Sequence, residues 1–228
     1  MVMNDTIAAI FDMDGVLVDT YHAHFRSWRE LAESEGIELT EADFSASFGR
    51  TSREIIAHHW KLEGGAGERV AALDRRKEAA FRRLLEEDFP AMPGAVELLG
   101  ALRASGFRLA VGSSAPPENV EAVVSRLGIG DLLGAVVTGA DVVRGKPDPQ
   151  VFLLAAERLG IAPGRCAVVE DAPPGVKAAK AAGMAAVGMA STGRTTQELV
   201  GADIVVSSLS ELSPAGLREL IENRRREK

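Results

Sequence analysis

The sequence predicts an α/β fold, a doubly wound parallel-sheet (Rossmann-like) core with an inserted α-helical cap domain. Over most of the chain, short apolar runs alternate with helical patterns, as in a parallel sheet that helices cover on both faces. Residues 21–89 interrupt this alternation, because they show helical periodicity with no convincing strand between the helices. The first observation predicts the core, and the second predicts the insertion.

Three apolar runs are followed at once by polar or Gly/Pro-rich residues that open a helix. These runs are residues 7–11, 109–111 and 167–169. Further strand candidates are 135–137, 185–189 and 204–206, and helical patterns cover 94–105, 117–127, 148–159, 175–182 and 214–225. Ligands of such sheets bind beyond the carboxyl ends of the strands. We therefore expect the site where the polar clusters follow the strands.

The helical insertion defines two domains, a catalytic core of residues 1–19 and 90–228 and a helical cap of residues 20–89. Thr51-Ser52-Arg53-Glu54 has the spacing of a capping box and predicts the start of a helix. Residues 64–67 are read as the linker to a helix over 68–87, since no Lys-Ser/Thr follows as in a phosphate-binding loop. Hinges near residues 18–20 and 89–93 would let this cap close over the polar edge of the sheet.

Composition and charge indicate a soluble protein with small-molecule partners. The net charge of −7 and the pI near 5.2 argue against binding to nucleic acid or to an anionic membrane surface. No apolar stretch approaches the roughly 20 residues of a membrane span, and no secretory signal is recognised, so we expect a cytoplasmic monomer. The single cysteine, Cys166, lies in an apolar run and is expected in the core.

Asp12-Met13-Asp14-Gly15 directly follows the first apolar run. A strand that ends here delivers two carboxylates to the sheet edge, and the glycine turn gives the two side chains different directions. That arrangement suits a metal-assisted nucleophile with a nearby acid/base. Two solvated aspartates in a turn are the alternative for this motif taken alone.

Similar polar positions follow later strands. Ser113 follows the run 109–111, Lys146-Pro147 precedes a helix, and Glu170-Asp171 follows the run 167–169. Each has a structural alternative: a helix cap for Ser113, a surface lysine for Lys146, and a helix-start acid pair for Glu170-Asp171. Together these alternatives require independent coincidences at one sheet edge, which favours a functional site.

In this order, Asp12-Met13-Asp14-Gly15-Val16, Ser113, Lys146-Pro147 and Glu170-Asp171 resemble the four motifs of the haloacid dehalogenase superfamily. The helical insertion resembles the small α-helical cap of one of its subfamilies. The resemblance covers nearly the whole chain, and four motifs in order are far more specific than one Asp-x-Asp. Within the superfamily the chain looks most like the β-phosphoglucomutase-like group of phosphatases and mutases.

The resemblance implies a Mg²⁺-dependent enzyme in which Asp12 attacks a phosphomonoester and becomes an aspartyl-phosphate. It implies metal ligands from the Asp12 carboxylate, the Asp14 backbone carbonyl and Asp171, with Glu170 bound directly or through water. Mg²⁺ suits such an all-oxygen site. Asp14 would protonate the leaving oxygen and then deprotonate the water that cleaves the intermediate.

The same resemblance implies phosphate ligands. Ser113 would bind a phosphate oxygen, helped by backbone N–H groups at the start of the helix 117–127, and Lys146 would hold phosphate and Asp12 together. Ser114 and Asn119, on the same loop, are further phosphate or substrate candidates.

The cap contributes Thr20, His24, Arg53 and Lys77, which with Trp28 match positions of the group's hinge and cap. Arg53 suits a second phosphate or sugar oxygens, although an exposed arginine in a first helical turn is common. His24 has the alternative of a satisfied helix histidine, and Lys77 that of a solvated face in a charge-rich helix. Selectivity for the substrate is expected to reside in such side chains.

We expect a phosphatase of small phosphorylated metabolites, with sugar phosphates as the preferred class. Known mutases of the group resemble Ser-x-Ser-Lys-Asn after the second motif strand, whereas here residues 113–119 lack the lysine and form a longer loop. A β-phosphoglucomutase-like sugar phosphomutase is therefore the alternative. A receiver-type phosphoacceptor module is disfavoured, because its acid pair and its phosphoacceptor lie on different strands and it has no helical insertion.

Overall fold

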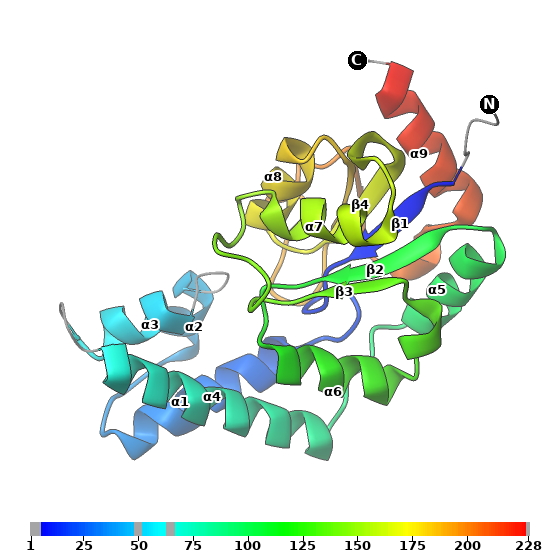
Figure 1. Cartoon of the computed structure of the whole chain (residues 1–228). Helices are drawn as coiled ribbons and strands as arrows, with labels where there is room; N and C mark the ends of the chain where they lie inside the picture. The colour runs from blue at the N-terminus through cyan, green and yellow to red at the C-terminus, as the bar shows by residue number, and fades with distance from the viewer. Residues whose placement is uncertain (1–5, 48–51, 63–66, 227–228) are drawn as a thin grey trace. The chain divides into compact units, whose positions relative to one another are not determined.

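The computed structural model describes residues 6–47, 52–62 and 67–226. The chain divides into two compact units: residues 1–19 with 91–228, and residues 20–90. The first unit holds the sheet and the second is helical (Figure 1).

The sheet of the first unit has six strands in the order β3-β2-β1-β4-β5-β6, and every neighbouring pair is parallel. The strands are β1 (Ala8–Phe11), β2 (Arg108–Gly112), β3 (Ala135–Val137), β4 (Cys166–Glu170), β5 (Ala185–Met189) and β6 (Ile204–Val206). The order runs outward from β1 toward β3 on one side and from β4 toward β6 on the other. This is the doubly wound arrangement, so the predicted fold class is confirmed.

Five α-helices of this unit connect or follow the strands: α5 (Ala95–Ala104), α6 (Pro117–Leu127), α7 (Gln150–Leu159), α8 (Pro173–Ala181) and α9 (Pro214–Arg226). Short 3₁₀ turns are η1 (Gly130–Leu132), η2 (Pro163–Arg165) and η3 (Leu209–Glu211). Figure 1 shows α7 on one side of the sheet and α5 on the other. Compared with the predicted ranges, α7 begins two residues late, because Asp148 Oδ1 accepts the Gln150 N–H instead of joining the helix.

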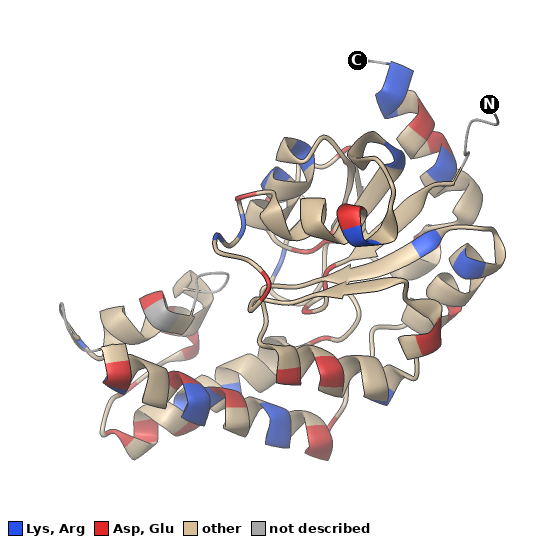
Figure 2. Cartoon of the chain, viewed as in Figure 1, with Lys and Arg blue, Asp and Glu red and all other residues tan. Residues whose placement is uncertain are grey.

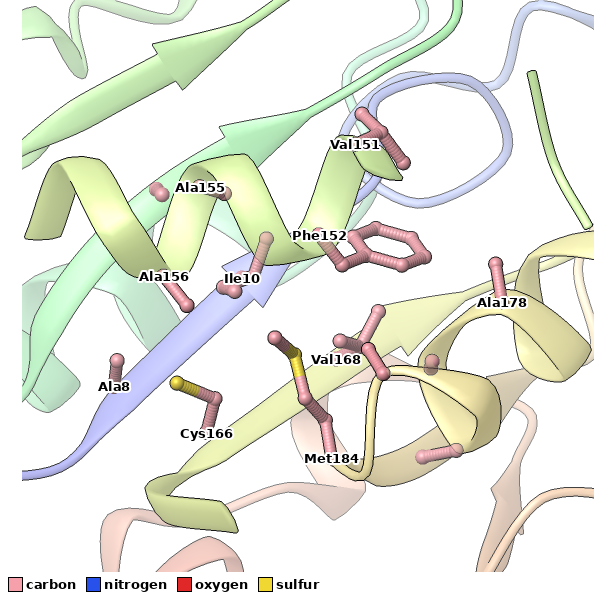
Figure 3. Close-up of a cluster of buried hydrophobic side chains, with 14 of the residues drawn as sticks. Ala8, Ile10, Val151, Phe152, Ala155, Ala156, Cys166, Val168, Ala178 and Met184 are labelled. Atoms are coloured by element: carbon pink, nitrogen blue, oxygen red, sulfur yellow. The ribbon is translucent and has the colours of Figure 1, made fainter. Parts of the chain in front are cut away.

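The core between the sheet and helices α7 and α8 is built from small and β-branched side chains around Phe152 (Figure 3). Ala8 and Ile10 of β1 face this cluster, and Ala9, between them, is equally buried outside it. Cys166 is fully buried here, as predicted, and burial raises the pKa of its thiol to about 12.

The helical unit contains α1 (Tyr21–Ser34), α2 (Glu41–Ser47), α3 (Ser52–His59) and α4 (Gly67–Glu87), with no strand among its described residues. Helices α1 and α4 pack together, and the unit has its own core, which includes Trp28, Phe44 and Trp60. Charges of both signs are spread along α1 and α4 (Figure 2). Thr51 and residues 64–66 lie outside the described residues, so the capping-box and linker predictions are not followed there.

Across the described part of the chain, every helix is too short or too polar to traverse a lipid bilayer.

The packing of Phe152 provides a test of the core. Its ring lies against Gly112 and Ile10 and is fully buried, whereas the neighbouring Leu153 is 38% exposed. We expect Phe152→Ala to lower the free energy of unfolding by about 3–5 kcal/mol, because it leaves a cavity against the sheet. Leu153→Ala, on the same helix, should cost less than about 1 kcal/mol. Urea denaturation of both variants measures the difference, and equal losses would contradict this account of the core.

Candidate functional site

The carboxyl ends of β1 and β4 bring three acidic side chains together. The two strands pair with Phe11 opposite Val169, and the Asp12 N–H donates to the Val169 carbonyl at 2.9 Å. One carboxylate oxygen each from Asp12, Glu170 and Asp171 lies within 4.8 Å of the others. The three residues are only 7%, 1% and 5% exposed. The structure thus joins the first and last sequence motifs in one buried acidic cluster.

Lys146 enters the same cluster from the segment before α7. Its Nζ lies 2.9 Å from Asp12 Oδ1, donates to Glu170 Oε1, and stands 5.0 Å from the centre of the Phe152 ring. Burial alone would lower the pKa of Lys146, but the charges of Asp12 and Glu170 outweigh it and raise the pKa above its ordinary value. Lys146 is therefore a fixed cation, which excludes the surface-lysine alternative.

Burial and the charges of neighbouring carboxylates raise the pKa of two carboxyl groups of the cluster. Burial, followed by the charges of Glu170 and Asp14, raises the pKa of Asp12 to about 8, although Lys146 opposes the rise. Burial and the charges of Glu170 and Asp12 likewise raise the pKa of Asp171 well above its usual range. Closely spaced buried carboxylates of this kind favour a bound cation. The all-oxygen donor set fits a hard divalent ion.

Two glycines give the carboxylates their space. Gly15 has φ +71°, and a Cβ there would lie 2.3 Å from Asp171 Oδ2. A Cβ on Gly175, in the first turn of α8, would lie 1.8 Å from Glu170 Oε1. Glu170 Oε2 accepts the Ala172 N–H at 2.7 Å, so the Glu170 carboxylate lies at the start of α8, where the helix dipole favours negative charge.

Asp14 lies in the turn between these elements. It is half-buried, while Met13 beside it points into the core and its carbonyl accepts the Leu17 N–H at 2.8 Å. This turn places Asp14 two residues beyond the buried Asp12.

Ser113 follows β2, the strand next to β1 on the other side. Its hydroxyl is buried and accepts the Ala115 N–H at 3.0 Å, which leaves its own proton to donate to a ligand. Ser114 is exposed, and Asn119, in the first turn of α6, is buried. The loop is anchored from β3 by the Gly139 N–H, which donates to the Ala115 carbonyl at 2.8 Å.

The structure adds one residue that the sequence reasoning missed. Arg194, on the loop after β5, has its Nε 3.9 Å from Asp171 Oδ2, and the two side chains are 9% and 7% exposed. The strand-end rule directs attention to the loop after β5, but no local feature of the sequence marks Arg194 as the inward-facing residue of that loop.

The cap candidates form a separate cluster within the helical unit. Lys77 Nζ lies 2.8 Å from His24 Nδ1 and 2.8 Å from Glu78 Oε1, and it stands over the rings of Trp28 and Phe81. Lys77 is 1% exposed, so the solvated-face alternative is wrong. Sequence reasoning also missed Glu78. Because Glu78 directly follows Lys77, helical periodicity alone places the two side chains on different faces of the helix.

The two remaining cap candidates differ in what the structure says of them. Thr20 is fully buried, and its carbonyl accepts the His24 N–H at 2.9 Å. Arg53 lies in α3, but its side chain falls outside the described residues.

Comparison with known proteins agrees with these motifs. The sequence model of the haloacid dehalogenase-like hydrolases matches residues 8–183. The β-phosphoglucomutase of Bacillus subtilis (strain 168) is 34% identical over 219 residues, which cover 93% of this chain and 94% of that protein. The validoxylamine A 7'-phosphate phosphatase of Streptomyces hygroscopicus subsp. limoneus is 34% identical over 207 residues, 90% of this chain and 94% of that protein.

A solved structure extends the match to the fold. The crystal structure of β-phosphoglucomutase from Clostridium difficile superimposes with a TM-score of 0.83 at 26% identity, and the match covers 96% of this chain and 98% of that one. The resemblance drawn from the four motifs is thereby confirmed. The chain belongs to the haloacid dehalogenase-like hydrolase family.

Proposed function

We propose that this protein is a Mg²⁺-dependent phosphatase that hydrolyses small phosphomonoesters, with sugar phosphates as its substrate class. The observation that carries the proposal is the buried Asp12 carboxylate, 2.9 Å from Lys146 and inside the three-acid cluster. Relatives of both kinds, a β-phosphoglucomutase and a validoxylamine A 7'-phosphate phosphatase, support a small phosphorylated substrate.

The ion would be held by Asp12 and Asp171, with the Asp14 backbone carbonyl. Bound there, Mg²⁺ supplies positive charge that offsets the repulsion between a carboxylate and an anionic phosphate. Both oxygens of Glu170 already accept hydrogen bonds, from Lys146 and from the Ala172 N–H. This favours a water-mediated role for Glu170.

Asp12 is the proposed nucleophile. Its carboxylate oxygen forms a bond to phosphorus while the bond from phosphorus to the leaving oxygen breaks, which gives an aspartyl-phosphate. Lys146 stabilises the ionised form of Asp12 and neutralises charge on the transferring group. The Ser113 hydroxyl donates to a phosphate oxygen, because its acceptor side is already occupied by the Ala115 N–H.

Asp14 is the proposed general acid and base. Its half-buried side chain belongs to the turn that follows Asp12, and its charge raises the pKa of Asp12. Asp14 protonates the leaving oxygen, and its carboxylate then takes a proton from the water that attacks the aspartyl-phosphate.

Substrate selection is assigned to two groups of residues. On the core these are Ser114 and Asn119; on the helical cap, proposed as residues 20–89, they are Thr20, His24, Arg53 and Lys77. The net charge of −7 supports a small metabolite over nucleic acid or a membrane surface as partner, and we propose a cytoplasmic monomer.

The choice of hydrolase over mutase depends on the loop after β2. Glu118 is exposed in the first turn of α6, where the mutases of the group have a lysine nearby. Residues 113–119 therefore offer no lysine to the second phosphate of a bisphosphate intermediate. Hydrolysis of a monophosphate needs no such contact.

We expect Asp12→Asn to lower turnover by at least about 10³-fold and to abolish the phospho-enzyme, because the amide keeps the shape of the side chain and loses the nucleophile. Asp131→Asn, an exposed aspartate on η1, is the matched control and should retain full activity. Phosphate release and intact-protein mass spectrometry measure both effects. Substantial turnover by a folded Asp12→Asn protein would sink the assignment.

Chelation should inactivate the enzyme reversibly. We expect EDTA to stop phosphate release and Mg²⁺ to restore it, and Asp171→Ala to require at least about tenfold more Mg²⁺ for half-maximal activity than Glu170→Gln. The difference arises because Asp171 would contact the ion and Glu170 would act through water. Full activity after exhaustive chelation, or a larger effect from Glu170→Gln, would contradict these roles.

We expect inorganic phosphate as the dominant product from β-glucose 1-phosphate, even with a catalytic amount of glucose 1,6-bisphosphate. The reason is the loop of residues 114–119, which lacks the lysine of the mutases and differs from theirs in length. Product analysis by ³¹P NMR over time distinguishes the two activities. Glucose 6-phosphate forming much faster than inorganic phosphate would overturn the hydrolase and establish the mutase.

A further inference from the structure

The loop after β5 is fixed against the acidic cluster by its own turn. The Arg194 N–H donates to the Ser191 carbonyl at 3.0 Å, and Gly193 supplies the positive φ of +79° that this turn needs. The Thr192 hydroxyl donates to Asp19 Oδ2 at 2.5 Å. The backbone that carries Arg194 is therefore anchored to the segment that follows the Asp12–Gly15 turn.

Asp171, Gly15 and the β5 loop meet at one point. A Cβ on Gly15 would lie 2.3 Å from Asp171 Oδ2 and 2.9 Å from Ser191 Oγ, so these two oxygens flank the same small space. Arg194 Nε lies 3.9 Å from that Oδ2 atom, and its side chain is 9% exposed. A buried guanidinium thus faces the residue proposed as a direct metal ligand.

Asp171 has both negatively and positively charged neighbours. One carboxylate oxygen each of Asp12 and Glu170 lies within 4.8 Å of an Asp171 oxygen, whereas Arg194 Nε lies 3.9 Å from Asp171 Oδ2. Arg194 is therefore a counter-ion of the cluster although it comes from a different strand end than Lys146. Because the two side chains are 9% and 7% exposed, solvent and salt screen their interaction less than that of a surface pair.

Counter-ions and metal ions compete for the same negative charge. The three cluster carboxylates exceed the two cationic side chains by one charge, so the cluster attracts a divalent ion. Without Arg194 the negative charge of the cluster would be larger and would attract the ion more strongly.

We infer that Arg194 acts as a counter-ion of Asp171 and limits the affinity of the site for its divalent cation. The inference rests on the proposed function, since it concerns the same metal site. It assigns no contact with substrate to Arg194. The inference predicts the direction in which the metal affinity changes. Removing the arginine tightens metal binding, whereas loss of a merely structural contact weakens it.

The test measures binding of Mn²⁺ alone, by electron paramagnetic resonance of the free ion, at one fixed pH and ionic strength. Arg194→Met and Arg194→Gln both remove the charge, and we expect each to lower the Kd for Mn²⁺ by about tenfold. Arg194→Lys keeps the charge and should stay within about twofold of the wild type. Circular dichroism checks the fold of every variant, and the two charge-removing variants guard against one failing to fold.

Arg224→Met is the matched control. Arg224 pairs with Asp203 at 3.1 Å, and its side chain is 15% exposed, so its loss changes the net charge equally but away from the cluster. We expect its Kd to match the wild type. An unchanged or raised Kd in the charge-removing Arg194 variants would overturn the inference, as would weaker inhibition by inorganic phosphate with unchanged Mn²⁺ binding. No Mn²⁺ binding by the wild type would instead overturn the metal site beneath it.

Discussion

The rest of the site depends on the pairing of β1 with β4, which sets acidic side chains beside one another in a buried place. Phe11 lies opposite Val169, so Asp12, just past the end of β1, comes beside Glu170, the last residue of β4. Their repulsion is offset by Lys146, whose Nζ contacts both. Removing one charged side chain from such a buried group leaves the charge of its partner uncompensated. A substitution here therefore affects the stability of this edge of the sheet as well as its chemistry.

The same constraint explains why small residues surround the cluster. Gly15, Gly139 and Gly175 each stand where a Cβ would lie within 2.5 Å of an oxygen of a neighbouring segment. At Gly15 and Gly175 that oxygen belongs to a cluster carboxylate, and at Gly139 it is the Ser114 carbonyl. The loops can therefore approach so closely only because these positions have no side chain. At Gly15 and Gly175, carboxylate oxygens occupy the space that a side chain would fill.

The strand-end motifs were predictable because an apolar run of a parallel sheet is continuous and its polar ends are local in sequence. All six strands and the grouping of Asp12 with Glu170-Asp171 follow from that rule. The burial of Arg194 could not be predicted in the same way, because nothing in the local Thr/Gly-rich sequence indicates that this side chain points inward. Lys77 shows the same limit, because its burial depends on rings contributed by another helix as well as by its own.

The two ends of the helical insertion are held together by the core itself. Val18 pairs with Ala91 in an isolated antiparallel bridge, and the Met92 N–H donates to the Leu17 carbonyl at 2.9 Å. These contacts lie outside residues 20–90 and bring the two ends of the insertion together. The entropic cost of closing the insertion grows only slowly with its length. Residues 20–90 form one contiguous segment, and a change in their number leaves the contacts that close the insertion in place. The helical unit is in this sense independent of the sheet to which its ends are joined.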